Sequence, residues 1–409
     1  MIADDETDDG FEDAEDLVRV DRVPERELLP IEPSQQPDPW HKPRKQWIRS
    51  EQWGRLTGRL LDDLHLDGRP LRYLTLPGRY LLDVRHLHGV CEQRGVRLRF
   101  LGFDSSRSDD PEITVSMDEV WRLPFIDKES VLQPDRIEEL AGNRRSVASQ
   151  ALGHFGHFDI INLDLCDSVA SRDAGASGSS LEAIKSLIEW QSDHRKEPWY
   201  LFLTTRADRE AVKPSVMKKL LQVLHKNLQR NSDFQRAAAD SQLFDEDSIV
   251  AEINRIDTKA KNTETLLDDQ FMRAFGIGLS KWLLRLSLRA WKVKLEINAC
   301  YRVGDETQTP NMISLAFRFD SIPEPIHDAI GLVPAARIAR QLEQAPSEDQ
   351  LAVLFLHRIT KLIDVDELLF ADEELREQMV VANAELMAQA RFDRQEMIDW
   401  GRAACWQPQ

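Results

Sequence analysis

The sequence predicts an α/β fold: a seven-stranded, mostly parallel sheet with a C-terminal antiparallel hairpin, and helical extensions at both ends. Two observations predict it. Between residues 70 and 290, short apolar runs that read as buried strands alternate with longer segments of helical periodicity. Two longer β-rich runs then follow each other across a polar loop, which is the pattern of a hairpin.

The first 38 residues differ in composition from the rest. They hold 14 acids and three bases, in a chain of 409 residues whose formal net charge is −18. The segment has few periodic apolar residues and cannot bury enough surface to offset its ordering entropy, so we expect a disordered acidic tail at 1–38. Such a tail acts as a solubilising spacer or docks on a basic protein partner.

A basic, aromatic segment follows at 39–69. Four bases and two tryptophans fall within the ten residues Trp40–Arg49, and apolar residues near helical spacing continue to Leu66. One interpretation is a helix that binds a nucleic-acid backbone and stacks on bases. The other is a packing helix with buried tryptophans and solvated bases. The residues assigned to nucleic-acid binding are Lys42, Arg44, Lys45, Trp47 and Arg49.

The α/β region is predicted at 70–322. Pro77-Gly78 ends its first strand, Gly95 ends its first helix, and Phe158–Leu163 is its clearest buried strand. The predicted strands are 72–76, 96–103, 112–116, 158–163 and 198–205, with helices at 79–94, 134–150 and 181–193.

The remaining elements are a helical insertion at about 207–290, the hairpin, and a helical extension at 323–409. The hairpin is formed by residues 291–301 and 311–319 and is expected to add one antiparallel strand at the edge of the sheet.

Cysteine spacing and hydropathy exclude several classes of protein. The four cysteines lack CxxC spacing, which argues against a zinc site and a disulfide framework. No run approaches the roughly 18 apolar residues of a membrane span. The chain opens with acids rather than a basic leader. We therefore expect a cytoplasmic protein with reduced thiols, no metal site and no membrane partner.

The order of elements over residues 70–320 resembles the class I S-adenosylmethionine-dependent methyltransferases, which have a Rossmann-like fold. Three landmarks carry the resemblance. The turn Thr75-Leu76-Pro77-Gly78 follows the first strand, Asp104 ends the second, and Leu163-Asp164-Leu165-Cys166-Asp167-Ser168 follows the fourth. The turn holds one glycine where the family often has two or three.

The resemblance implies S-adenosylmethionine as cofactor. Gly78 would let the cofactor approach the backbone, Asp104 would accept both ribose hydroxyls, and Asp118, just past the third predicted strand, would contact the adenine. Asp164 and Asp167 are the candidate catalytic residues. Amine methyltransferases often carry an Asp/Asn-Pro-Pro-aromatic motif at this place, and the present sequence has its acid but neither its prolines nor its aromatic residue. The sequence also looks somewhat like the Asp-Leu-Asp-Pro-Phe-Gly run of tRNA guanine-N2 dimethyltransferases.

Asp104, Asp164 and Asp167 could each instead be a helix cap or a loop anchor. Two functions are compatible with the resemblance. The first is a methyltransferase that acts on or binds RNA or DNA. The second is a catalytically inactive subunit of a larger complex, such as a defence or nucleic-acid-modification system, whose protein partners dock on the acidic tail or the C-terminal helices. A nicotinamide-dependent dehydrogenase is a distant third function, because the GxGxxG turn is absent.

Overall fold

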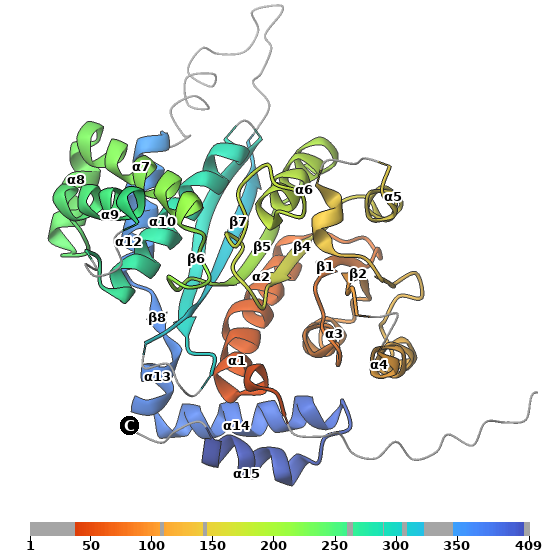
Figure 1. Ribbon diagram of the computed structural model, residues 1–409. Helices are drawn as coiled ribbons and strands as arrows, with labels where there is room; N and C mark the ends of the chain where they lie inside the picture. Colours follow the sequence, from red (N-terminus) through yellow and green to blue (C-terminus); the bar gives the residue numbers. More distant parts are fainter. Residues whose placement is uncertain are drawn as a thin grey trace, which may run out of the picture. The chain divides into compact units, whose positions relative to one another are not determined.

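A computed structural model describes residues 37–106, 110–141, 145–259, 265–288, 290–304, 309–322 and 347–404. Its centre is a sheet of eight strands in the order β3-β2-β1-β4-β5-β7-β6-β8 (Figure 1). The strands are β1 Leu71–Thr75, β2 Leu98–Phe103, β3 Val131–Gln133, β4 Ile160–Asp164, β5 Trp199–Arg206, β6 Trp291–Tyr301, β7 Met312–Ser321 and β8 Ile363–Asp364.

The sheet confirms the predicted fold class. Strands β1 to β5 pair in parallel, and β7 is antiparallel to both β5 and β6. The antiparallel strand was expected at the edge, but β7 lies inside the sheet, with β6 and then β8 beyond it. Strand β8 has only two residues, which is too short to leave a periodic signal in the sequence. The strand order reverses between β1 and β4, where crossover connections leave in opposite directions.

Helices cover both faces of the sheet (Figure 1). One face carries α1 Pro43–Trp47, the π-helical stretch η3 Ile48–Gly54, α2 Arg55–Asp63, α3 Leu82–Glu92 and α4 Pro111–Arg122. The other carries η4 Ile137–Leu140, α5 Val147–Phe155, α6 Ser180–His194, α7 Pro214–Arg230, α8 Ser232–Asp240, α9 Glu246–Thr258, α10 Asp268–Ser287 and α12 Glu348–Thr360. The remaining helices are η2 Pro39–His41, α13 Val365–Ala371, α14 Glu373–Ala388 and α15 Arg394–Ala404.

Strand alternation divides the interior into two cores. On β5, Trp199 and Leu201 face the core shared with α6, α7 and α10, whereas Tyr200 and Phe202 face the core shared with η3, α2 and α3. Successive side chains of a strand point to opposite faces, so a strand that is apolar throughout needs a helical layer on each side. The uninterrupted apolar runs of the sequence have this cause.

The third predicted strand, 112–116, is wrong. These residues belong to helix α4, whose N-cap Asp110 accepts a hydrogen bond from the backbone of Glu112 and whose first residue is Pro111. Ile113, Met117 and Val120 recur at helical spacing and are buried. The true β3 follows, and the predicted helix 134–150 consists of the short η4 and then α5.

The segments at the two ends of the described chain pack on the α/β region. Residues 38–409 form one compact unit. Helix α14 lies against α1, and α14 and α15 bury a small core with Tyr80 and Leu82 (Figure 1). The predicted acidic tail lies outside the described residues up to residue 36, as does 323–346 of the C-terminal extension. Among the described helices, none has the length and apolar character that a membrane span requires.

Candidate functional site

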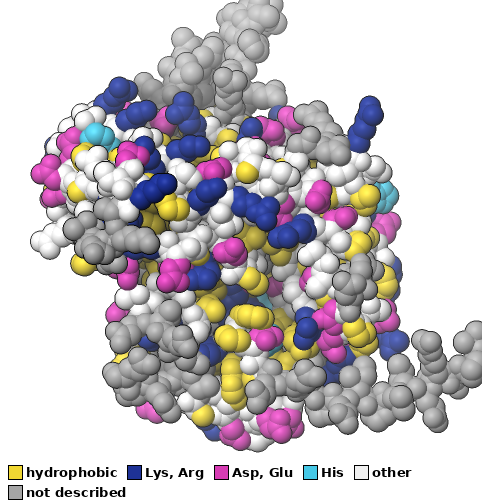
Figure 2. All heavy atoms as spheres, viewed as in Figure 1, with side chains coloured by type: hydrophobic (Ala, Val, Ile, Leu, Met, Phe, Trp, Pro, Cys, Tyr) yellow, Lys and Arg dark blue, Asp and Glu magenta, His cyan; other side chains and the backbone are white. Residues whose placement is uncertain are grey.

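A cavity of about 860 Å³ opens at the carboxyl ends of β1, β2 and β4. Open α/β sheets bind ligands at this edge, beside the reversal of strand order. Figure 2 shows the hollowed face, where hydrophobic side chains mix with basic and acidic ones. The cavity is walled by the N-terminal helical segment, the turn after β1, the ends of β2, β4 and β5, and the two ends of the hairpin that face it. Residues far apart in the sequence therefore meet here.

Gly78 lies in the turn between β1 and α3 and lines the cavity. Its φ is +64°, in the left-handed region that glycine adopts without strain. A Cβ atom built at this position would meet no protein atom within 4 Å. The glycine is thus explained by the backbone conformation of the turn, and the space above it lies open to a ligand.

Asp104 follows β2 and also lines the cavity. Its Oδ1 accepts hydrogen bonds from the backbone nitrogen of Ser106 at 2.9 Å and from the Ser106 hydroxyl at 2.6 Å. These bonds fix the carboxylate in the orientation of an Asx turn. Oδ2 has no hydrogen bond to any residue that the structure describes.

Asp118 lies apart from the cavity. It is an exposed residue of α4 and does not belong to the cavity wall. Its expected role depended on a strand at 112–116, and β3 actually ends at Gln133. The helix removes the geometric basis of that assignment.

Beneath the cavity, β1 and β4 carry a buried polar network around Asp83. Tyr73 donates to Asp83 Oδ2 at 2.7 Å, Thr75 donates to the same oxygen, and Asn162 donates to the Tyr73 hydroxyl at 2.9 Å. Burial raises the pKa of Asp83 although both hydroxyls oppose the shift. Its Oδ1 is buried and has no hydrogen-bond partner within the described segments. The sequence analysis did not identify Asp83. Two polar residues on one face of a buried strand, Tyr73 and Thr75, could have indicated that a polar partner lies opposite them.

Arg49, on η3, is a buried cation that lines the cavity and is 5% exposed. Its Nε and Nη1 make no hydrogen bond with any part of the chain that the structure describes. Burial lowers its pKa, while the nearby charges of Asp164 and Asp83 oppose that shift. Such a guanidinium is costly, because the three N–H donors of Nε and Nη1 have been removed from water without replacement. The unsatisfied donors of Arg49 are available to an anionic group of a ligand.

Lys45 lies four residues before Arg49 and is equally buried. Its Nζ donates to Asp164 Oδ1 at 2.5 Å and to the Tyr301 hydroxyl at 3.0 Å. Burial alone would lower the pKa of Lys45, but Asp164 and Tyr301 outweigh it and the pKa is raised. Lysine thus stays charged, and Asp164, whose side chain is 27% exposed, is held by an ammonium group rather than left open.

Asp167, the second predicted catalytic residue, is exposed and lies outside the cavity wall. Its Oδ1 accepts a hydrogen bond from the backbone nitrogen of Ser168 at 2.7 Å, which is a local loop contact. The two candidate catalytic acids after the fourth strand therefore differ: Asp164 lies in the site, and Asp167 lies at the surface.

The predicted nucleic-acid interface is not exposed. The five side chains assigned to it are between 2% and 5% exposed; they are Lys42, Arg44, Lys45, Trp47 and Arg49. Arg44, for example, donates to the Arg302 carbonyl at 2.8 Å and pairs with Asp366 at 3.0 Å. The segment packs between the sheet and α14, so its basic side chains make contacts inside the protein. The prediction that they bind a phosphate backbone is therefore wrong.

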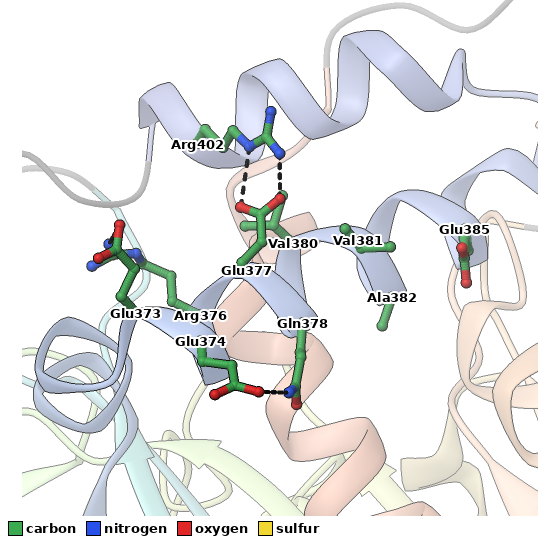
Figure 3. A pocket seen from close by; sticks show the side chains of 10 residues that line it. All are labelled: Glu373, Glu374, Arg376, Glu377, Gln378, Val380, Val381, Ala382, Glu385 and Arg402. Atoms are coloured by element: carbon green, nitrogen blue, oxygen red, sulfur yellow. Dashed lines mark hydrogen bonds and ion pairs between the residues drawn. The ribbon is translucent and has the colours of Figure 1, made fainter.

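A second hollow lies on the outer side of α14 and α15 (Figure 3). Four glutamates line it, and three of them are already paired: Glu377 with Arg402 and Glu385 with Arg394 on α15, and Glu373 with Arg376 within α14. Figure 3 shows the Glu377–Arg402 pair joining the two helices. These pairs account for most of the acidic charge of the hollow. Within the described part of the chain, no three His, Cys, Asp or Glu side chains gather as a metal site would require.

The sheet defines the fold. Parallel strands β1 to β5, with the antiparallel β7 inserted beside β5, form a Rossmann-like fold of the kind found in class I methyltransferases, and the cavity lies at the carboxyl edge of its parallel strands. More specifically, the chain belongs to the PP_RS20740-like family, whose model matches residues 34–402. A search of curated proteins returned no match.

Solved structures similar to this chain carry methyltransferase names. They include the CMeT domain of the citrinin polyketide synthase, at 14% identity, TM-score 0.33 and 66% coverage of this chain. An O-methyltransferase family protein from Burkholderia thailandensis has 12% identity, TM-score 0.27 and 68% coverage. A class I S-adenosylmethionine-dependent methyltransferase from Listeria monocytogenes has 12% identity, TM-score 0.31 and 72% coverage. This chain spans 53%, 58% and 70% of those chains.

Proposed function

We propose that the chain binds S-adenosylmethionine in this cavity and transfers its methyl group. The observation that carries the proposal is the pair of unsatisfied buried groups, the Arg49 guanidinium and Asp83 Oδ1. Both line the cavity, and the charge of Asp83 acts on Arg49. A ligand that presents a carboxylate and an ammonium group side by side, as the amino-acid end of S-adenosylmethionine does, satisfies both.

The other end of the cavity suits the nucleoside. Asp104 presents a carboxylate oriented by Ser106, and such a group accepts hydrogen bonds from two ribose hydroxyls. Gly78 precedes both Asp83 and Asp104 in the chain, lines the same cavity and leaves open space above the turn. When bound, S-adenosylmethionine supplies a methyl group already activated by its sulfonium. The chain's own residues then bind the two ends of the molecule and orient it.

A second candidate function is a methyltransferase-fold subunit that binds partners without catalysis. The Lys45–Asp164 ion pair favours it, because it occupies the position at the end of β4 where the resemblance implies an open carboxylate. The turn after β1 also favours a non-catalytic subunit, because it has one glycine where the methyltransferases often have two or three. Residues 1–38, which are acidic, and the C-terminal helices would then be the candidate docking segments for protein partners.

We do not carry the nucleic-acid acceptor forward as part of the main proposal. It depended on exposed bases between residues 42 and 49, and those side chains are buried. A nucleic-acid substrate would require a different basic surface.

Isothermal titration calorimetry with S-adenosylmethionine and S-adenosylhomocysteine tests the proposal. We expect the wild-type protein to bind both, and Arg49→Met to bind about 10- to 100-fold more weakly, the usual loss for charge-assisted hydrogen bonds. Asp104→Ala should also weaken binding. The matched control is Arg55→Met, because Arg55 is a half-exposed residue of α2 that pairs with Glu51 outside the cavity.

Two results would count against the enzyme. If neither compound binds the folded wild-type protein at millimolar concentration, the cavity is not a cofactor site and the binding-subunit function replaces it. If both compounds bind Arg49→Met and wild type equally, the amino-acid end lies elsewhere and the main observation has been misread.

A further inference from the structure

The wall of the cavity at the ends of β4 and β6 holds a second buried constellation, formed by Lys45, Asp164 and Tyr301. Lys45 and Tyr301 are 3% and 2% exposed. Besides its bonds to Asp164 and Tyr301, the Lys45 ammonium lies 4.9 Å from the ring centroid of Trp53. The ammonium is thus fixed in place by two oxygens and one aromatic ring.

Counting donors shows what this constellation still offers. An ammonium group has three N–H bonds, and two are used by Asp164 and Tyr301. The Tyr301 hydroxyl accepts from Lys45, so its own hydrogen is left to donate, and it has no acceptor among the residues that the structure describes. Burial raises the pKa of Tyr301, which keeps the phenol protonated. One charged donor and one neutral donor therefore converge on the same part of the cavity.

The charges nearby favour an acidic acceptor group. Asp164 is neutralised by Lys45, and Arg206, at the end of β5, pairs with Asp208 at 2.9 Å. A protonated amine brought to this wall would face the Lys45 ammonium directly. An ionised hydroxyl would instead meet two preorganised donors in a place sheltered from water, the arrangement that stabilises an oxyanion.

We propose that Lys45 and Tyr301 bind the methyl acceptor and that the acceptor is a small planar molecule with an acidic hydroxyl, a phenol or an enol. This rests on the proposed function, since it assumes that the methyl donor occupies the same cavity. The indole of Trp40, which is 47% exposed and lines the cavity, supplies a flat surface for a planar ring.

The chemical step balances with groups present in the cavity. The acceptor hydroxyl releases its proton to the oxygen of Asp164 that Lys45 does not hold, and from there to water through the exposed part of that side chain. The acceptor oxygen, held by Lys45 and Tyr301, forms a bond to the methyl carbon while the sulfur–methyl bond breaks, its electron pair remaining on sulfur. The product is a neutral methyl ether, which is no longer attracted to Lys45 and leaves.

The test uses p-nitrophenol as a probe, because its ionised form absorbs visible light. The full chain is saturated with S-adenosylhomocysteine and the probe is titrated with acid. We expect the apparent pKa of the bound probe to be lowered by about one unit or more, since the two donors stabilise the phenolate. Tyr301→Phe should lose part of this shift and Lys45→Met nearly all of it. Tyr200→Phe, in the core on β5 and outside the cavity wall, should behave as wild type.

The outcomes separate this inference from the proposed function. If S-adenosylhomocysteine binds wild type and Tyr301→Phe but the probe keeps its solution pKa in both, the acceptor assignment is wrong and the proposed function stands. Tighter binding of 4-nitrobenzylamine than of p-nitrophenol would also overturn it, in favour of an amine acceptor. Failure of S-adenosylhomocysteine to bind the folded protein removes both. Tyr301→Phe is the decisive variant, because it leaves the Lys45–Asp164 pair intact if Lys45→Met does not fold.

Discussion

Buried charged groups near the two ends of β4 differ in whether the protein supplies their hydrogen-bond partners. Before the strand, Asp159 is fully buried, yet both of its oxygens are satisfied: Arg69 contacts them at 2.8 and 3.0 Å, and Arg195 lies 2.9 Å from Oδ1. Its pKa is lowered, because the two guanidinium groups outweigh the effect of burial. At the carboxyl end of the sheet, Arg49 and Asp83 are also buried, but Arg49 Nε and Nη1 and Asp83 Oδ1 have no hydrogen-bond partner among the described residues.

This difference separates structural charge from functional charge. A buried ion that is paired and hydrogen-bonded within the chain needs nothing more and contributes to holding the fold. A buried ion that the fold leaves without partners lowers stability unless a ligand supplies them. The Asp159 cluster at the amino edge of the sheet thus stabilises the fold, whereas Arg49 and Asp83 at the carboxyl edge are available to a ligand.

Breaking the paired end should have the largest effect. Asp159→Asn removes the carboxylate charge from the fully buried Arg195 and the partly exposed Arg69, so we expect the free energy of unfolding to fall by about 3–5 kcal/mol. Urea denaturation measures it. Asp62→Asn is the control, because Asp62 forms an exposed pair with Arg94 and should change stability by less than about 1 kcal/mol. Equal losses in the two variants would contradict a structural role for the Asp159 cluster.

Removing the unsatisfied cation should do the reverse. Arg49→Met deletes a buried charge without deleting any hydrogen bond, so the ligand-free variant should be as stable as wild type or more stable, by up to about 3 kcal/mol. Saturating S-adenosylhomocysteine should then raise the melting temperature of wild type more than that of the variant. A large loss of stability in the ligand-free variant would show that Arg49 has a structural partner and that the comparison fails.

The sequence predicts most of the sheet because its strands carry their own signal. Strands β1, β4 and β5 are buried on both faces, so each appears as a continuous apolar run between turn residues. The failure at 112–116 has a local cause: Ile113 and Val115 are β-branched and suggest a strand, whereas the Asp110-Pro111 cap and the spacing to Met117 specify the helix. The short β3 is defined by its neighbour β2 rather than by its own residues.

The site is less predictable because its partners are distant in the chain. Lys45 and Asp164 are separated by 119 positions, and nothing near Lys45 announces that it is buried. The same bases that suggest a nucleic-acid surface become interior charges once α14 covers the segment. Gly78 and Asp104 could be placed from strand order alone, since both follow strands at the edge where ligands bind.

The pH dependence of Asp83 sharpens the comparison further. Its pKa is raised above 3.8 by burial, so the folded state holds the extra proton above about pH 4, and stability falls as pH rises through the folded pKa. The loss is about 1.4 kcal/mol for each unit of pKa difference. Asp83→Asn keeps an acceptor for Tyr73 and Thr75 and should lack this decline. Parallel stability curves for the two proteins from pH 4 to 7 would contradict an unsatisfied carboxylate.

Gly78→Ala is expected to give the smallest effect, because its φ of +64° costs a side chain about 1–2 kcal/mol while the added methyl group meets no protein atom. Gly89→Ala is the matched control: it also places a methyl group in open space, but within helix α3, where alanine should stabilise by about 0.5–1 kcal/mol. The affinity for S-adenosylhomocysteine then distinguishes two roles of the turn. If a ligand passes close over Gly78, the alanine weakens binding as well as folding, whereas an unchanged affinity would mean that glycine serves the backbone conformation alone and that the ligand is held by Arg49, Asp83 and Asp104.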